Sequence, residues 1–131
     1  MTNLNEISKQ VYEANKLKGF DVKKENMGQT LCLIHSEISE ALEAIRKNRF
    51  AKLEVFTLKN DITIEASEQE IIDRFNESFK EEIKDSFEDE IADTFIRLMD
   101  LVGAFEIDID KHIELKRRFN SLREYKHGKS F

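Results

Sequence analysis

Apolar residues recur every three or four positions along most of the chain, which is the spacing of one face of an α-helix. This pattern predicts four long helices, over about residues 4–18, 26–48, 85–105 and 108–124. The most regular apolar stripe belongs to the second of them and comprises Met27, Leu31, Ile34, Ile38, Ala41 and Ile45. We therefore expect amphipathic helices that pack against one another.

Polar residues at the predicted helix starts support these boundaries. Asn3 with Glu6, Ser67 with Glu70 and Asp85 with Glu88 each have the spacing of a capping box. The pair at Ser67 predicts a further, short helix that ends near residue 84. Asp108 or Asp110 is expected to cap the last helix.

The segment of residues 49–64 is ambiguous. Val55–Leu58 and Ile62–Ile64 are rich in β-branched and apolar residues, and Lys59-Asn60-Asp61 between them resembles a turn. The segment is therefore expected to form either a small β-hairpin or a loop. The predicted architecture is all-α: a four-helix bundle in a single domain over residues 1–131. An insertion, made of this segment and the short helix, separates its second and third long helices.

Composition narrows the class of protein. The 131 residues include no proline and four glycines, which disfavours an all-β fold, and the net charge of −6 disfavours binding to a nucleic acid polymer. A lone cysteine, Cys32, fits a reducing compartment. No apolar run is long enough to cross a bilayer, and the N-terminus does not resemble a signal peptide. We expect a cytoplasmic protein that does not bind membranes.

Two pairs of carboxylates, Glu37 with Glu40 and Glu90 with Asp93, are each three residues apart and so share one face of their helix. At about 100° per residue, both pairs fall on the same flank of the apolar stripe of their helix. Where the two helices pack, the four carboxylates can converge at the edge of the bundle. A hard divalent cation such as Mg²⁺ relieves the repulsion between converging carboxylates. The same spacing is also typical of a solvated helix face, so both interpretations stay open.

A di-iron centre is the other carboxylate-rich metal site that a helical bundle can hold. It needs two Glu-x-x-His motifs on separate helices and two further glutamates. Only Glu124 and His127 have this spacing. The sequence therefore disfavours a di-iron site.

Positive charge gathers near the C-terminus of this acidic chain. The residues concerned, with one amide among them, are Lys116, Asn120, Arg123, Lys126, His127 and Lys129. Lysine and arginine bind phosphate, and asparagine can bind a base or a sugar hydroxyl. A helix C-terminus also favours positive charge without any ligand. Together with a metal site, however, such a patch suits a polyphosphate.

Ordered blocks of this sequence resemble the MazG-like all-α nucleoside triphosphate pyrophosphohydrolases, in particular their phage and bacterial members. The blocks are residues 18–20, 33–44, 87–93, 107–113 and 120–129. Glu37 with Glu40 matches the ExxE motif of the family, and Glu90 with Asp93 matches its ExxD motif. Residues 49–85 fit least well, because they lengthen the usual gap between the two motifs.

The resemblance implies Mg²⁺-dependent cleavage of a nucleoside or deoxynucleoside triphosphate to the monophosphate and pyrophosphate, with Mn²⁺ as a substitute metal. Such an activity serves the house-cleaning of nucleotide pools. The catalytic and metal-binding residues would be Glu37, Glu40, Glu90 and Asp93. The substrate-binding residues would be Asn120, Arg123, Lys126 and Lys129. A homodimer or homotetramer is implied as well.

The runner-up interpretation is a helical module that binds a nucleotide or a protein without catalysis. The acidic pairs would then form a solvated face or a structural metal site. Release of pyrophosphate distinguishes the two interpretations.

Overall fold

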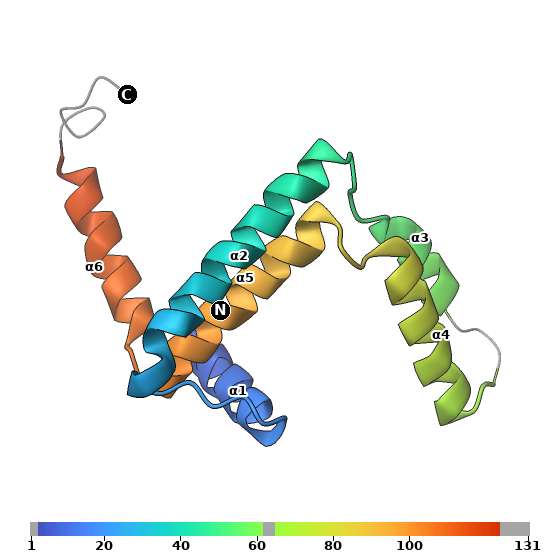
Figure 1. Cartoon of the computed structure of the whole chain (residues 1–131), viewed down its shortest axis with the longest axis horizontal. Helices are drawn as coiled ribbons and strands as arrows, with labels where there is room; N and C mark the ends of the chain where they lie inside the picture. Colours follow the sequence, from blue (N-terminus) through green and yellow to red (C-terminus); the bar gives the residue numbers. More distant parts are fainter. Residues whose placement is uncertain (1–2, 62–64, 124–131) are drawn as a thin grey trace. The chain divides into compact units, whose positions relative to one another are not determined.

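The computed structural model describes residues 3–61 and 65–123. This part of the chain contains six α-helices, one short 3-10 helix and no strand. The α-helices are α1 (Leu4–Leu17), α2 (Met27–Arg46), α3 (Leu53–Asn60), α4 (Glu68–Glu82), α5 (Phe87–Ala104) and α6 (Ile109–Ser121), and the 3-10 helix η1 spans Lys24–Asn26 (Figure 1). The predicted all-α class is therefore confirmed. Within the described ranges, none of these helices has both the length and the apolar character needed to span a membrane.

Three of the predicted N-caps are confirmed. The side chain of Asn3 accepts a hydrogen bond from the backbone N–H of Glu6 at 3.2 Å, and Ser67 accepts one from Glu70 at 3.1 Å. Asp108 accepts one from Lys111 at 3.2 Å. Each bond satisfies an N–H group that has no partner within its own helix.

The predicted cap of α5 was wrong by one residue. Asp85 has a φ of 62°, so its backbone is left-handed rather than extended. Ser86 is the cap instead, and its hydroxyl accepts from the backbone N–H of Asp89 at 3.2 Å. The Asp89 carboxylate in turn accepts from the N–H of Asp85 at 2.9 Å.

The chain divides into two compact units. Unit 1 comprises Met1–Thr30 with Ile96–Phe131, and unit 2 comprises Leu31–Phe95. The single domain that the sequence predicts stays a prediction.

In unit 1, α1 packs closely against the C-terminal part of α5. A Cβ atom on Gly103 would collide with the backbone of Ser8 and with the side chain of Tyr12, so only glycine allows this approach. One turn away along α5, Asn15 donates a hydrogen bond to the buried carboxylate of Asp100 at 3.0 Å.

The start of α6 is tied to the start of α1. The Asp110 carboxylate accepts hydrogen bonds from the backbone N–H groups of Leu4 and Asn5, at 3.3 and 3.1 Å. The Asn5 side chain donates to Asp108 at 2.8 Å. Asp110, one of the two candidate caps for α6, therefore caps α1 instead.

In unit 2, α2 and α5 lie side by side (Figure 1), and acidic residues of the two helices meet there. The side of α2 that is buried comprises Ile34, Glu37, Ala41 and Ala44. Three residues of the predicted stripe, Leu31, Ile38 and Ile45, are instead about half exposed. The buried side of α2 is therefore displaced from the apolar stripe toward the acidic residues.

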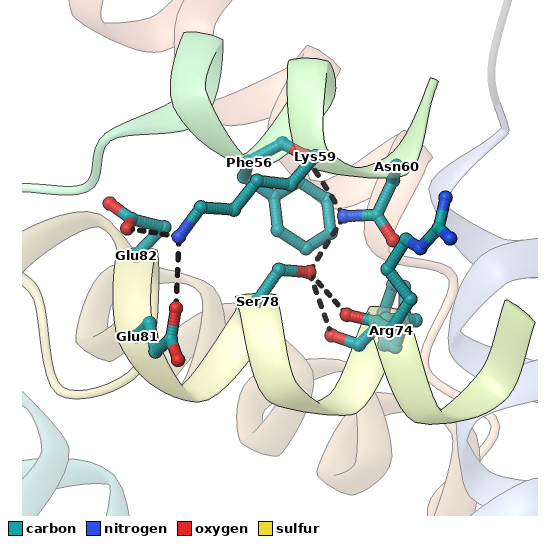
Figure 2. Close-up of polar contacts among 8 residues, drawn as sticks. Phe56, Lys59, Asn60, Arg74, Ser78, Glu81 and Glu82 are labelled. Atoms are coloured by element: carbon teal, nitrogen blue, oxygen red, sulfur yellow. Dashed lines mark hydrogen bonds and ion pairs between the residues drawn. The ribbon is translucent and has the colours of Figure 1, made fainter. Parts of the chain in front are cut away.

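The expectation of a β-hairpin or loop around Val55–Leu58 was wrong, because these residues lie in α3. The proposed second strand, Ile62–Ile64, lies outside the described residues. The short helix predicted from Ser67 is α4, and α3 packs along it. Tertiary contacts hold α3 as a helix. The Phe56 ring meets Phe75 edge-on at 5.5 Å. The Asn60 side chain donates a hydrogen bond to Ser78 at 2.7 Å (Figure 2).

Candidate metal centre

Helices α2 and α5 bring three of the four predicted metal ligands together. Oxygen atoms of the carboxylates of Glu37, Glu40 and Glu90 lie within 4.8 Å of one another. Because residues three apart lie on one side of a helix, the backbone of α2 presents Glu37 and Glu40 jointly to α5. Glu90 then meets both from the first turn of α5.

The cluster lies deeper than the sequence suggests. Glu37 is 6% exposed and Glu90 is 7% exposed, whereas Glu40 is exposed and Asp93 is half-buried. The sequence placed all four acids at the edge of the bundle. The first acid of each pair is instead buried where α2 and α5 meet, because the buried side of α2 is displaced toward Glu37.

Burial and crowding hold protons on the cluster. Burial, the negative charge of Glu40 and a hydrogen bond with Glu37 together raise the pKa of Glu90 to about 7. The pKa of Glu40 is also raised, first by its hydrogen bond with Glu37 and then by burial. A carboxyl group that is protonated near neutral pH lets these side chains approach without full repulsion.

Asp93 is not among the three residues whose oxygen atoms gather within 4.8 Å. Its negative charge nevertheless contributes to the raised pKa of Glu40, which places Asp93 within electrostatic reach of the cluster. The structure thus groups Glu37, Glu40 and Glu90 tightly, with Asp93 beside them.

A second group of carboxylates shares Glu90 with this cluster. Oxygen atoms of Asp85, Asp89 and Glu90 also lie within 4.8 Å of one another. Asp85 forms ion pairs with Lys84 at 3.2 Å and Arg49 at 3.9 Å, so cations already balance part of its charge. Helical spacing does not reveal Asp85 as a potential ligand, because the position of Asp85 depends on the left-handed turn before α5.

The predicted phosphate-binding residues belong to unit 1, whereas the acidic cluster belongs to unit 2. The ammonium group of Lys116 on α6 and the guanidinium group of Arg123, just after α6, lie over the ring of Phe119, at 5.2 and 5.5 Å from its centroid. Asn120 is half-buried. Lys126, His127 and Lys129 lie outside the described residues. Joint action of these residues with the acids stays a prediction.

A cavity of about 570 Å³ lies in unit 1, beside α1 and the end of α5. Among the described residues, none of the predicted site residues lines it. Its walls carry both signs of charge: Lys9 and Lys16 line it, and so do Glu13, Glu106 and Asp108. It therefore has no strong preference for an anion or a cation.

Comparison of the chain with family models, with curated proteins and with solved structures gives no match. Three crowded oxygen donors, two of them buried, suit a hard divalent cation. An exposed carboxylate at the rim, Glu40, can also accept a proton from water.

Proposed function

We propose that this protein is a Mg²⁺-dependent nucleoside triphosphate pyrophosphohydrolase of the MazG-like kind. It would convert a nucleoside or deoxynucleoside triphosphate and water to the monophosphate and pyrophosphate, as a house-cleaning activity in the cytoplasm. The observation that carries the proposal is the gathering of Glu37, Glu40 and Glu90 oxygens within 4.8 Å, from the two motifs that resemble the family.

The donor set fits the metal. Magnesium ions take oxygen ligands and usually bind through a few carboxylates together with substrate phosphates. Glu37, Glu40, Glu90 and Asp93 would hold the ion, and a bound Mg²⁺ or Mn²⁺ would neutralise the triphosphate and stabilise the leaving pyrophosphate. Burial first, and then the negative charge of Glu40, raise the pKa of Glu90, and a divalent cation would balance that charge.

The residues of the chain have distinct roles in this proposal. The buried Glu37 and Glu90 orient the cluster, and the exposed Glu40 is the carboxylate that water reaches. Glu40 therefore accepts the proton of the attacking water. The substrate contacts would be made by Asn120, Arg123, Lys126 and Lys129.

The proposal includes a completed four-helix bundle and a homodimer or homotetramer. Helix α2 leaves Leu31, Ile38, Leu42 and Ile45 about half exposed along one side, and Phe95 on α5 is 57% exposed. Only four apolar residues are buried in the described ranges, namely Val22, Ile34, Ala41 and Ala44. Further helices packed on this side would remove the exposed surface from water.

Pyrophosphate release from a panel of nucleoside and deoxynucleoside triphosphates tests the activity. We expect release in Mg²⁺ or Mn²⁺ and none in excess EDTA. Glu40→Gln and Asp93→Asn should each lower the rate at least about 100-fold, because each removes an oxygen ligand or a proton acceptor. Neither residue is fully buried, so circular dichroism should be unchanged.

The matched control is Glu77→Gln, which makes the same change at an exposed acid on α4 and should keep the wild-type rate. A wild-type rate in Glu40→Gln or Asp93→Asn, or full turnover in EDTA, contradicts the metal assignment. Binding of a nucleotide without release of pyrophosphate across the panel would favour the non-catalytic module.

A further inference from the structure

Positive charge is scarce in the unit that holds the acidic cluster. The residues of unit 2, Leu31–Phe95, include eight lysines and arginines against 17 aspartates and glutamates. These surroundings repel a triphosphate unless a metal ion or a nearby cation attracts it. The substrate-binding residues expected from the sequence belong to unit 1. A cation of unit 2 that lies beside the cluster is therefore a candidate to hold the phosphates.

Two cations of unit 2 contact one carboxylate of the acidic groups. The Lys84 ammonium and the Arg49 guanidinium lie 3.2 and 3.9 Å from the Oδ2 atom of Asp85. An oxygen atom of Asp85 lies within 4.8 Å of one of Glu90, which belongs to the metal cluster. Asp85 is therefore the group that links Arg49 and Lys84 to the cluster.

Backbone contacts fix the segments that carry these two cations. The backbone N–H of Phe87 donates to the carbonyl oxygen of Arg49 at 2.9 Å, and the N–H of Ala51 donates to the Glu88 carboxylate at 2.8 Å. These bonds join the segment after α2 to the start of α5. Lys84 lies in the turn that precedes α5. A substitution of the Arg49 or Lys84 side chain leaves these bonds in place.

The ion pairs at Asp85 are open to water. The side chains of Arg49, Lys84 and Asp85 are each about half exposed. Exposed ion pairs contribute little to stability because water screens them. In this group, two positive charges share one negative charge. A phosphate group carries more negative charge than a carboxylate and offers more oxygen acceptors, so it can replace Asp85 against both cations.

We propose that Arg49 and Lys84 bind the β- and γ-phosphates of the triphosphate, whose oxygen atoms take the place of the Asp85 carboxylate. Asp89 and Glu90 also have oxygen atoms close to Asp85, so the phosphates bind here only together with a divalent cation. Negative charge gathers on the pyrophosphate as it leaves, and both cations stabilise it. The inference rests on the proposed function and gives it two phosphate contacts in the same compact unit as the metal ligands.

Binding of inorganic pyrophosphate to the full chain in Mg²⁺, measured by isothermal titration calorimetry, tests the inference. Arg49→Gln and Lys84→Gln should each weaken binding about tenfold, because each removes a charged partner of the phosphates. Arg49→Lys keeps the charge and should weaken binding less than Arg49→Gln. Mg²⁺ alone should bind both glutamine variants at least as tightly as the wild type, because neither side chain holds the metal.

The Asp85→Asn variant should have the opposite effect. It removes the negative charge that competes with phosphate for the two cations, and asparagine tolerates the left-handed backbone of this position. We expect it to bind pyrophosphate about threefold more tightly than the wild type, which a purely structural role of the ion pairs would not produce. The matched control is Arg74→Gln, at an exposed arginine on α4, and it should bind like the wild type.

Each other result overturns the inference. If Arg49→Gln and Lys84→Gln bind pyrophosphate like the wild type, these cations do not hold the phosphates, although turnover of the nucleotide panel would leave the proposed function standing. If Asp85→Asn binds pyrophosphate more weakly, Asp85 holds the metal or the turn and does not compete with the substrate. If the wild type binds no pyrophosphate in Mg²⁺, the phosphate contacts fail, and the nucleotide panel still tests the activity separately.

Discussion

The Glu90→Gln variant removes a buried negative charge while keeping the size of the side chain. The folded state raises the pKa of Glu90 from 4.5 to about 7 through burial, the charge of Glu40 and the hydrogen bond with Glu37. Between these two values, the folded chain holds a proton on Glu90 that the unfolded chain has released. Wild-type stability therefore falls as pH rises through this window and stays level above it.

The size of the effect follows from the pKa. A change from 4.5 to about 7 corresponds to about 3 kcal/mol, at roughly 1.4 kcal/mol per pH unit. Water that reaches the exposed Glu40 screens part of this energy. We therefore expect Glu90→Gln to stabilise the metal-free protein by about 1–3 kcal/mol at pH above about 7, or roughly 5–10 °C in melting temperature for a chain of this length.

Thermal unfolding followed by circular dichroism in excess EDTA measures this effect across about pH 4 to 9. The melting temperature of the wild type should decline toward neutral pH, that of Glu90→Gln should decline less, and that of Glu77→Gln should follow the wild type. Equal melting temperatures for wild type and Glu90→Gln at every pH would refute the reasoning. Added Mg²⁺ should reverse the order, because it stabilises only the folded form that retains the carboxylate ligand.

Three further predictions concern unit 1 and are checked by chemical denaturation. Gly103→Ala should destabilise the fold by about 2 kcal/mol or more, because the added methyl group would collide with the Ser8 backbone. The control Gly28→Ala has open space around the added methyl group and should be neutral or slightly stabilising. Equal effects of the two substitutions would argue against close packing of α1 on α5. Ser8→Ala should be neutral or stabilising by about 1 kcal/mol, because the buried Ser8 hydroxyl has no hydrogen-bond partner among the described residues. A large loss of stability would reveal a hydrogen bond at this hydroxyl. Burial raises the pKa of Asp100, so the wild-type protein should lose stability as pH rises above about 4. Asp100→Asn should remove this loss, and an unchanged dependence of stability on pH would contradict the prediction.

Local sequence signals predicted most helix starts correctly. The caps at Asn3, Ser67 and Asp108 depend on a side chain and a backbone N–H three residues away, so the sequence contains all that is needed. The same reasoning failed at α5, where Asp85 adopts a left-handed backbone and Ser86 becomes the cap. That turn also carries the Asp85 ion pair with Arg49, a residue far from it in the sequence.

Helix α3 shows where local preference is insufficient. Val55, Phe56 and Thr57 favour strands when taken alone. In the structure, the Phe56 ring packs on Phe75, and Lys59 pairs with two acids of α4. Contacts with a helix that lies later in the chain outweigh a propensity of at most about 1 kcal/mol per residue.

The sequence by itself determined that the chain is helical and that each acidic pair shares one side of its helix, because both properties depend on spacing within a few residues. Only the tertiary structure decided how deeply those acids lie. The buried side of α2 carries Ala41 and Ala44 together with Glu37, and small side chains let two helices approach closely. That approach buries Glu37 and Glu90 between the helices, which raises the pKa of Glu90 and leaves Ile38 and Ile45 exposed.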